Sequence, residues 1–174
     1  MLVPFEEITH LFAEFEHTAF RLETRRGYAS DRAGARFQAF LRGTDPAPEP
    51  DNPWHVNVRQ KAEQGARFSR VRIIDQPPTD GQRFLMAAAA ATPGEDIRVL
   101  ARAEAERLEL PAYDFWLFDS RTLVRFDIDQ TDTTTGVEVR TDPAEVLAAC
   151  RARDRAWPAA TPSAEVWAQV RSSV

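Results

Sequence analysis

The stretch DFWLFDSRTLVRFDIDQTDTTTGVEVR, residues 114–140, decides the fold class of this chain. It contains three runs rich in β-branched and aromatic residues, and polar turn residues separate them, first Asp119 and Ser120 and then the segment 129–136. Such a pattern predicts three strands that pair in sequence order as an antiparallel meander. Because one face of such a sheet must be covered, we expect helices to pack against it.

Further strands are indicated upstream of the meander. In AFRLETR, residues 19–25, apolar and polar residues alternate, which is typical of a half-buried strand. RFSRVRIID, residues 67–75, predicts a second such strand, with Val71 and Ile73 on one face and Arg70 and Arg72 on the other. A short strand is also expected within EDIRVLAR, residues 95–102.

Helical periodicity and capping residues predict the remaining elements. The expected helices span residues 4–17, 31–42, 53–64, 79–91, 102–108, 142–157 and 163–172. Four prolines within residues 44–53 predict an extended connection, which we interpret as a loop inside one domain over residues 43–53. The prediction is therefore a single α+β domain over residues 1–174, with a mainly antiparallel sheet of about five or six strands, flanking helices, and a C-terminal helix or tail over 163–174.

Composition excludes several classes of protein. The 174 residues include 22 basic and 27 acidic side chains, for a formal net charge of −5, so a nucleic-acid binder that depends on phosphate neutralisation is disfavoured. The single cysteine, Cys150, excludes an intrachain disulfide framework. No apolar run approaches the ~20 residues that span a bilayer, and the N-terminus lacks a basic leader, so we expect a soluble cytoplasmic protein.

Metal and covalent chemistry are also poorly supported. Lys61 is the only lysine, so a Schiff base or a phosphate-loop lysine would have to use it. Three scattered histidines do not make a zinc site, and acids such as Glu95 and Asp96 follow a glycine turn, where local hydrogen bonding explains them. We expect no cofactor, no metal and no catalytic residue.

Apart from Lys61, the 22 lysine and arginine residues are all arginine, and several of them fall on predicted strands. The candidate ligand-binding residues are Arg21, Glu23, Arg70, Arg72, Arg121 and Asp154. Forked guanidinium groups on rigid strands recognise phosphate or carboxylate well. The alternative is structural: the same arginines pair with acids such as Glu23, Asp96 and Asp154, and a buried Asp154 would draw Arg21 or Arg121 toward it.

A second candidate surface is apolar. Trp116 and Phe118 share a face of the predicted strand in DFWLFDS, and such a face needs a cover, either a helix or a partner protein. We take both residues as candidate partner-binding residues. For His17 and Cys150 the sequence leaves a chemical and a structural role open, and the structural role is favoured.

The segments FEHTAFRLETR, GEDIR, LPAYDFWLFDSR and CRARDRAW, in that order, resemble an actinobacterial family of unknown function. The resemblance extends from Phe5 to about Pro162, and the run MAAAAAT, residues 86–92, departs from the pattern. Members of that family are small single-domain proteins, often encoded beside helix-turn-helix regulators of the Cro/repressor type. The resemblance assigns no reaction and no catalytic residue.

Two function classes follow. The first is a non-enzymatic regulatory module that binds a helix-turn-helix regulator, as the resemblance implies, since an acidic protein can meet the basic face of a DNA-binding domain. The second is a small-ligand or enzymatic domain with an arginine-lined pocket for an anionic phosphate or carboxylate group. Direct binding of nucleic acid or of a membrane is not expected, and a homodimer is left open.

Overall fold

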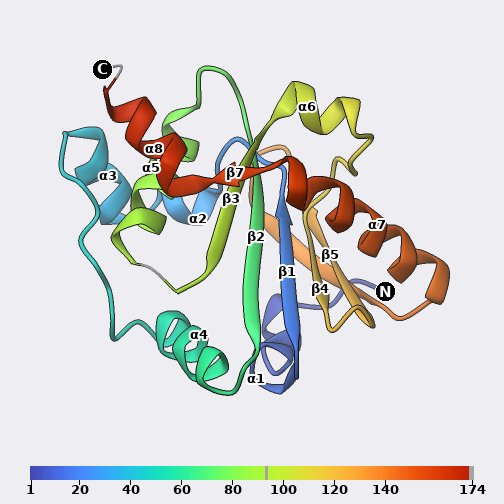
Figure 1. Cartoon of the computed structure of the whole chain (residues 1–174). Coiled ribbons are helices and arrows are strands. Elements are labelled where there is room, and N and C mark those ends of the chain that lie inside the picture. Colours follow the sequence, from blue (N-terminus) through green and yellow to red (C-terminus); the bar gives the residue numbers. More distant parts are fainter. Residues whose placement is uncertain (93, 173–174) are drawn as a thin grey trace.

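The computed structural model describes residues 1–92 and 94–172 (Figure 1). Within these residues the strands form one seven-stranded sheet with the order β6-β5-β4-β1-β2-β3-β7. The strands are β1 (Thr18–Glu23), β2 (Arg67–Ile74), β3 (Asp96–Ala101), β4 (Phe115–Phe118), β5 (Thr122–Ile128), β6 (Thr134–Arg140) and β7 (Thr161–Pro162). The architecture is mixed α/β, and most of its strand pairings are antiparallel.

The helices are α1 (Leu11–Glu14), α2 (Ala29–Arg32), α3 (Ala35–Leu41), α4 (Pro53–Glu63), α5 (Asp80–Ala91), α6 (Arg102–Arg107), α7 (Pro143–Ala159) and α8 (Ser163–Ser172). The helix expected over 4–17 is replaced by a 3-10 turn, Phe5–Ile8, followed by the single turn α1. The helix expected over 31–42 is divided at Gly34, whose extended backbone starts α3. Residues 173–174 of the predicted C-terminal segment lie outside the described residues.

The meander predicted from residues 114–140 is present as β4, β5 and β6. At its first turn Asp119 and Ser120 both have positive φ, and the Asp119 carboxylate accepts hydrogen bonds from the backbone N–H groups of Glu16, His17 and Thr18. Burial would raise the pKa of Asp119, but these three donors lower it below its usual range. This acid therefore fixes the start of β1 against the meander.

The sequence prediction missed the parallel centre of the sheet. β1 pairs with β2, and β2 with β3, in parallel, and β7 adds a short antiparallel edge. The connection from β1 to β2 contains α2, α3 and α4, and that from β2 to β3 contains α5. Crossovers of this length return the chain to the same end of the sheet, so the strands they join run parallel. The expected five or six strands are therefore seven.

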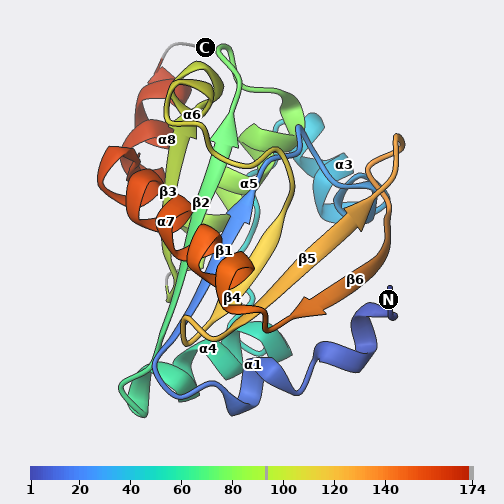
Figure 2. The ribbon, with the colours of Figure 1, turned by 90° about the vertical axis from the view of Figure 1, so that its right-hand side faces the viewer.

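Helices cover both faces of the sheet. Figure 2 shows α7 on one side of the strands and α3 and α5 on the other. On the α7 face, Phe20, Leu22, Val71 and Ile73 form the main core with residues of α7. On the opposite face, residues of α1 and α4 enclose one apolar cluster and residues of α5 and α8 enclose another. Across the described residues, no helix is both long enough and apolar enough to cross a membrane.

Candidate functional site

Four of the predicted site residues meet between the two apolar clusters. Because β1 and β2 are parallel and in register, Arg21 lies beside Arg70 and Glu23 lies beside Arg72. Alternation along the strands places all four side chains on the face opposite α7. We call this group the arginine cluster. The alternation of Arg70 and Arg72 with Val71 and Ile73 is confirmed.

Glu23 is the centre of the arginine cluster. Its Oε1 accepts a 2.5 Å hydrogen bond from Nη1 of Arg70, and its Oε2 accepts a 2.5 Å bond from Nε of Arg72. Nε of Arg21 lies 3.8 Å from Oε1. Burial would raise the pKa of Glu23, but Arg70, Arg72 and Arg21 together hold it well below its usual range. Glu23 is therefore a carboxylate at any ordinary pH.

Each of the three side-chain nitrogens of Arg70 donates a hydrogen bond to a carboxylate. Besides its bond to Glu23, its Nε and Nη2 donate to Oε2 of Glu95 at 3.1 and 2.9 Å. The other oxygen of Glu95 accepts a 2.7 Å bond from the indole N–H of Trp54. Burial would lower the pKa of Arg70, but the two carboxylates raise it above its usual range. This guanidinium is therefore paired with two carboxylates, which compete with any anionic ligand for its charge.

Asp114 completes the cluster at the meander, and the sequence analysis assigned it no role. Its carboxylate accepts bonds from Nη2 of Arg21, from the backbone N–H and hydroxyl of Thr24, and from the hydroxyl of Tyr28. Burial, Glu23 and Asp114 raise the pKa of Tyr28 well above its usual range. Arg21 also lies over the ring of Phe126, with its guanidinium carbon 3.8 Å from the ring centroid. A buried Asp154 was expected to draw Arg21 or Arg121, but Asp154 is exposed and the acid that binds Arg21 is Asp114.

A cavity opens above the arginine cluster. Its volume is about 490 Å³, and its walls come from α2, α3, α4 and α5. Arg70, Arg72 and Ile97 line it on the side of the sheet, and Phe37, Phe84 and Trp54 supply apolar surface. We call it the arginine pocket. Its size lies in the range of small-molecule sites, and its walls combine apolar side chains with many polar and charged ones.

Two charged groups of the arginine pocket keep free hydrogen-bonding capacity. Arg72 donates from Nε to Glu23 and from Nη1 to the carbonyl of Leu85, whereas its Nη2 has no acceptor among the described residues. Asp31 lines the same pocket, and among those residues nothing donates a hydrogen bond to its carboxyl group. Burial and the nearby Glu23 raise the pKa of Asp31 above its usual range, against the opposite effect of Arg72. No sequence signal pointed to Asp31.

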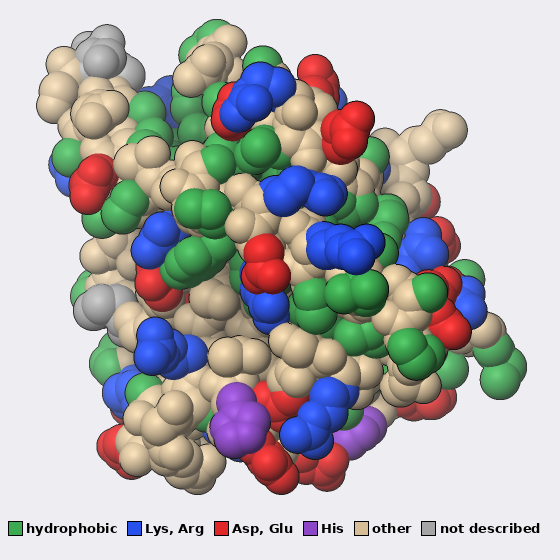
Figure 3. Space-filling view, turned by 45° about the vertical axis from the view of Figure 1, so that its right-hand side comes forward, with side chains coloured by type: hydrophobic (Ala, Val, Ile, Leu, Met, Phe, Trp, Pro, Cys, Tyr) green, Lys and Arg blue, Asp and Glu red, His purple; other side chains and the backbone are tan. Residues whose placement is uncertain are grey.

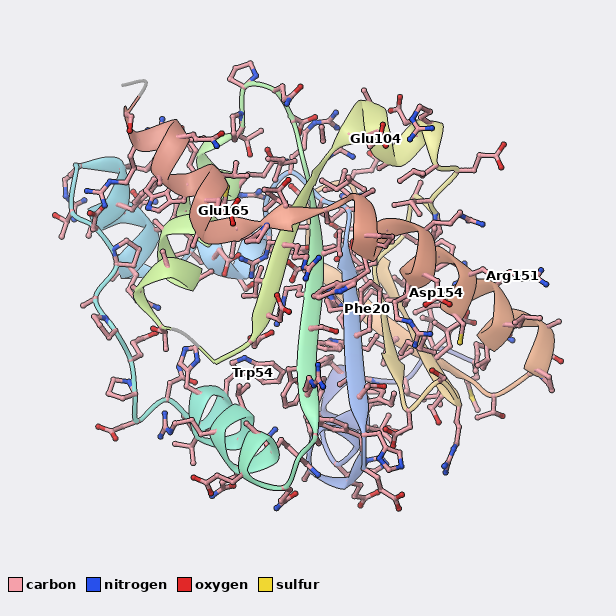
Figure 4. The ribbon with its side chains drawn as sticks, viewed as in Figure 1. Phe20, Trp54, Glu104, Arg151, Asp154 and Glu165 are labelled. Carbon is pink, nitrogen blue, oxygen red and sulfur yellow. The ribbon has the colours of Figure 1, made fainter. Side chains whose placement is uncertain are left out.

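The other two predicted ligand residues lie elsewhere. Arg121 is exposed in the turn between β4 and β5, where its backbone N–H donates to the carbonyl of Phe118. Asp154 is exposed on α7 and accepts a 2.8 Å bond from Nε of its neighbour Arg153. Figure 4 shows Asp154 on α7 and Trp54 on α4, at separate parts of the molecule. Arg121 and Asp154 therefore lie apart from the other four candidate ligand residues.

Trp116 and Phe118 do not form a surface. They are 4% and 3% exposed, and Phe12 of α1 packs edge-on against both rings, with centroid distances of 5.2 Å. Trp54 of α4 also contacts Trp116. The face they share was predicted correctly, but its cover is the chain's own helices. The assignment of these residues to partner binding is corrected to a core role.

The remaining candidates are dispersed. His17 is exposed, with Nε2 3.8 Å from a Glu16 oxygen, and Cys150 is half-buried against the core under α7. Among the described residues, no group of three His, Cys, Asp or Glu side chains is arranged to hold a metal. On the face that Figure 3 presents, basic and acidic side chains are interspersed.

The family of the chain follows from a comparison with family models. The model of a domain of unknown function, DUF6879, matches residues 6–168. This chain belongs to the DUF6879 family. A search of curated proteins finds no match. The solved structure of NucT from Helicobacter pylori is similar with a TM-score of 0.50 and 8% sequence identity, over 93% of this chain and 96% of that one. At that identity the similarity concerns the fold alone.

Proposed function

We propose that this DUF6879 chain is a small-ligand-binding domain, and that its arginine pocket binds a molecule with an anionic carboxylate or phosphate group. The observation that carries the proposal is a cavity of about 490 Å³ lined by Arg72, whose half-buried guanidinium group has one nitrogen, Nη2, without an acceptor among the described residues. A charge-assisted hydrogen bond to a group held in place by its other bonds is a strong and specific contact.

The arginine cluster makes Arg72 rigid. Glu23 and the carbonyl of Leu85 fix two of its nitrogens, so little side-chain freedom is lost when a ligand binds the third. Phe37, Phe84 and Trp54 provide apolar surface for the rest of the molecule. Affinity would therefore come from one preorganised polar contact and from apolar burial.

Binding is favoured over catalysis because of the state of the central acid. Three arginines hold Glu23 as a carboxylate, and a carboxyl group with a pKa that low is a poor proton acceptor near neutral pH. We therefore assign the arginine cluster a positioning role in ligand recognition and no acid–base step.

A thermal-shift experiment tests this proposal with three defined probes: inorganic phosphate, pyrophosphate and 3-phenylpropanoate. At least one should raise the melting temperature of the wild-type protein, and Arg72→Gln should reduce that rise. Arg121→Gln is the matched control, since Arg121 lies in an exposed turn away from the pocket. No shift with any probe, or equal shifts in the two variants, would overturn the proposal.

A second proposal concerns a protein partner. The resemblance noted above associates such chains with actinobacterial helix-turn-helix regulators, and the net charge of −5 suits contact with a basic DNA-binding domain. Binding should then weaken as salt rises, because screening reduces such attraction. Calorimetric titration against a helix-turn-helix regulator of the Cro/repressor type from the same genome, at two salt concentrations, tests it. Absence of binding at low salt would contradict it.

A further inference from the structure

Most of the charged side chains that line the arginine pocket are paired with an opposite charge, and one is not. Arg36 pairs with Glu49 at the rim, and Arg70 pairs with Glu95 and with Glu23 beneath it. Asp31 is the exception, because within residues 1–92 and 94–172 its carboxyl group has no salt bridge and no hydrogen-bond donor.

The charges that line the pocket balance only when Asp31 is ionised. Three guanidinium groups, those of Arg36, Arg70 and Arg72, then face three carboxylates, those of Glu49, Glu95 and Asp31. A ligand that brought only an anionic group would satisfy Arg72 and would repel Asp31. A ligand that also brought a cation would satisfy both, since opposite charges removed from water attract strongly.

Asp31 and Arg72 enter the pocket from different elements. Asp31 comes from α2 and Arg72 from β2, and both line the same cavity. The charge of Arg72 acts on Asp31, yet no salt bridge joins the two side chains. Asp31 therefore offers an acceptor and Arg72 a donor at separate positions in the pocket. Phe37, Phe84 and Trp54 supply the apolar part of its wall.

We propose that the ligand of the arginine pocket is a small zwitterion. Its carboxylate or phosphate accepts a hydrogen bond from Nη2 of Arg72, its ammonium group donates to the carboxylate of Asp31, and its apolar part packs against Phe37, Phe84 and Trp54. This inference rests on the proposed function and specifies its ligand class.

Isothermal titration calorimetry with three related probes tests the inference. L-Phenylalanine carries both charges, 3-phenylpropanoate only the carboxylate, and 2-phenylethylammonium only the cation. The wild-type protein should bind phenylalanine about tenfold or more tightly than either of the others, because each lost charged hydrogen bond costs at least that factor. In Asp31→Asn, phenylalanine should lose about tenfold in affinity and 3-phenylpropanoate should lose none.

Asp154→Asn is the matched control, because Asp154 is exposed on the other side of the sheet. It should leave all three affinities unchanged. If 3-phenylpropanoate binds the wild-type protein as tightly as phenylalanine, the zwitterion is overturned and the proposed function stands. Failure of all three probes also overturns the zwitterion, and phosphate and pyrophosphate then decide separately whether the proposed function falls with it.

Discussion

Nη2 of Arg21 donates a 2.8 Å hydrogen bond to Oδ2 of Asp114, and the two side chains are 6% and 0% exposed. The pair joins β1 to the start of β4, at the edge of the arginine cluster. Two further donor residues, Thr24 and Tyr28, satisfy the remaining lone pairs of Asp114. These bonds offset the desolvation of the Asp114 carboxylate, whereas Nε and Nη1 of Arg21 have no hydrogen-bond partner among the described residues.

Asp114→Asn should therefore destabilise the protein strongly. The substitution removes the carboxylate that is hydrogen-bonded to Arg21 and leaves Glu23, whose Oε1 lies 3.8 Å from Nε, as its remaining counter-ion. Nε and Nη1 of Arg21 already lack hydrogen-bond partners among the described residues. Breaking such a pair typically costs about 3–5 kcal/mol. Urea unfolding measures the loss, with Asp154→Asn as an exposed control, and a change in Asp114→Asn as small as in the control would show that the pair is unimportant.

Asp31→Asn should act in the opposite direction. Burial raises the pKa of Asp31, so ionising it in the folded protein costs free energy, and that cost is felt as the pH rises through its folded pKa. Removing the charge should raise the melting temperature at pH 7 by roughly 2–4 °C, which corresponds to about 1 kcal/mol at this chain length. The difference from the wild-type protein should disappear at a pH below 3.8, and a variant less stable at pH 7 would contradict an unpaired Asp31.

A higher melting temperature in Asp31→Asn would also bear on the function of Asp31. Residues that lower stability are retained where binding requires them, so a more stable Asp31→Asn that has lost its ligand would mark a binding residue. Scanning calorimetry and titration on the same preparation give both quantities.

Acid should weaken the arginine cluster through Glu23. Its pKa is lowered in the folded protein, so its contribution is complete above its usual value near 4.5 and is lost progressively as the pH falls below it. Glu23→Gln lacks this contribution at every pH. The difference in unfolding free energy between wild type and variant should thus shrink between pH 5 and pH 2, and a difference that stayed constant would refute the assigned charge.

The variant Trp116→Ala distinguishes a core role for Trp116 from a role in binding a partner. Because Trp116 is buried against Phe12, Trp54 and Phe68, its truncation should cost about 3–5 kcal/mol. Chemical unfolding checks this value. If the variant kept its stability and lost binding to a regulator, Trp116 would be a partner-binding residue and not a core residue.

The sequence carries local patterns well and distant contacts poorly. Alternation alone placed Arg70 and Arg72 on one face of β2 and located all three strands of the meander. It could not show that Glu95, from the turn before β3, returns to Arg70, because that contact depends on a parallel register set by a crossover through α5. The sequence also could not show that α1 and α4 pack over Trp116, because both helices lie far from it in the chain.

Asp31 shows the limit most clearly. In sequence it is one acid of a short helical segment, flanked by Ser30 and Arg32. Only the folded structure shows that Asp31 lines the same pocket as Arg72 and that its neighbour Arg32 instead pairs with Asp132. The absence of a partner for the Asp31 carboxyl group depends on the folded structure, so no local sequence pattern predicts it.

The most direct test of the binding claim is a ¹H–¹⁵N NMR titration of the whole chain with 3-phenylpropanoate. We expect chemical-shift changes to concentrate on the backbone of residues 30–37, on the indole N–H of Trp54 and on the side-chain Nε–H of Arg72. Residues around Asp154, which line a separate cavity on the other side of the sheet, should not respond. Changes centred on Thr18 and Asp154, or no changes with 3-phenylpropanoate, phosphate or pyrophosphate, would contradict the assignment of the arginine pocket as the ligand site.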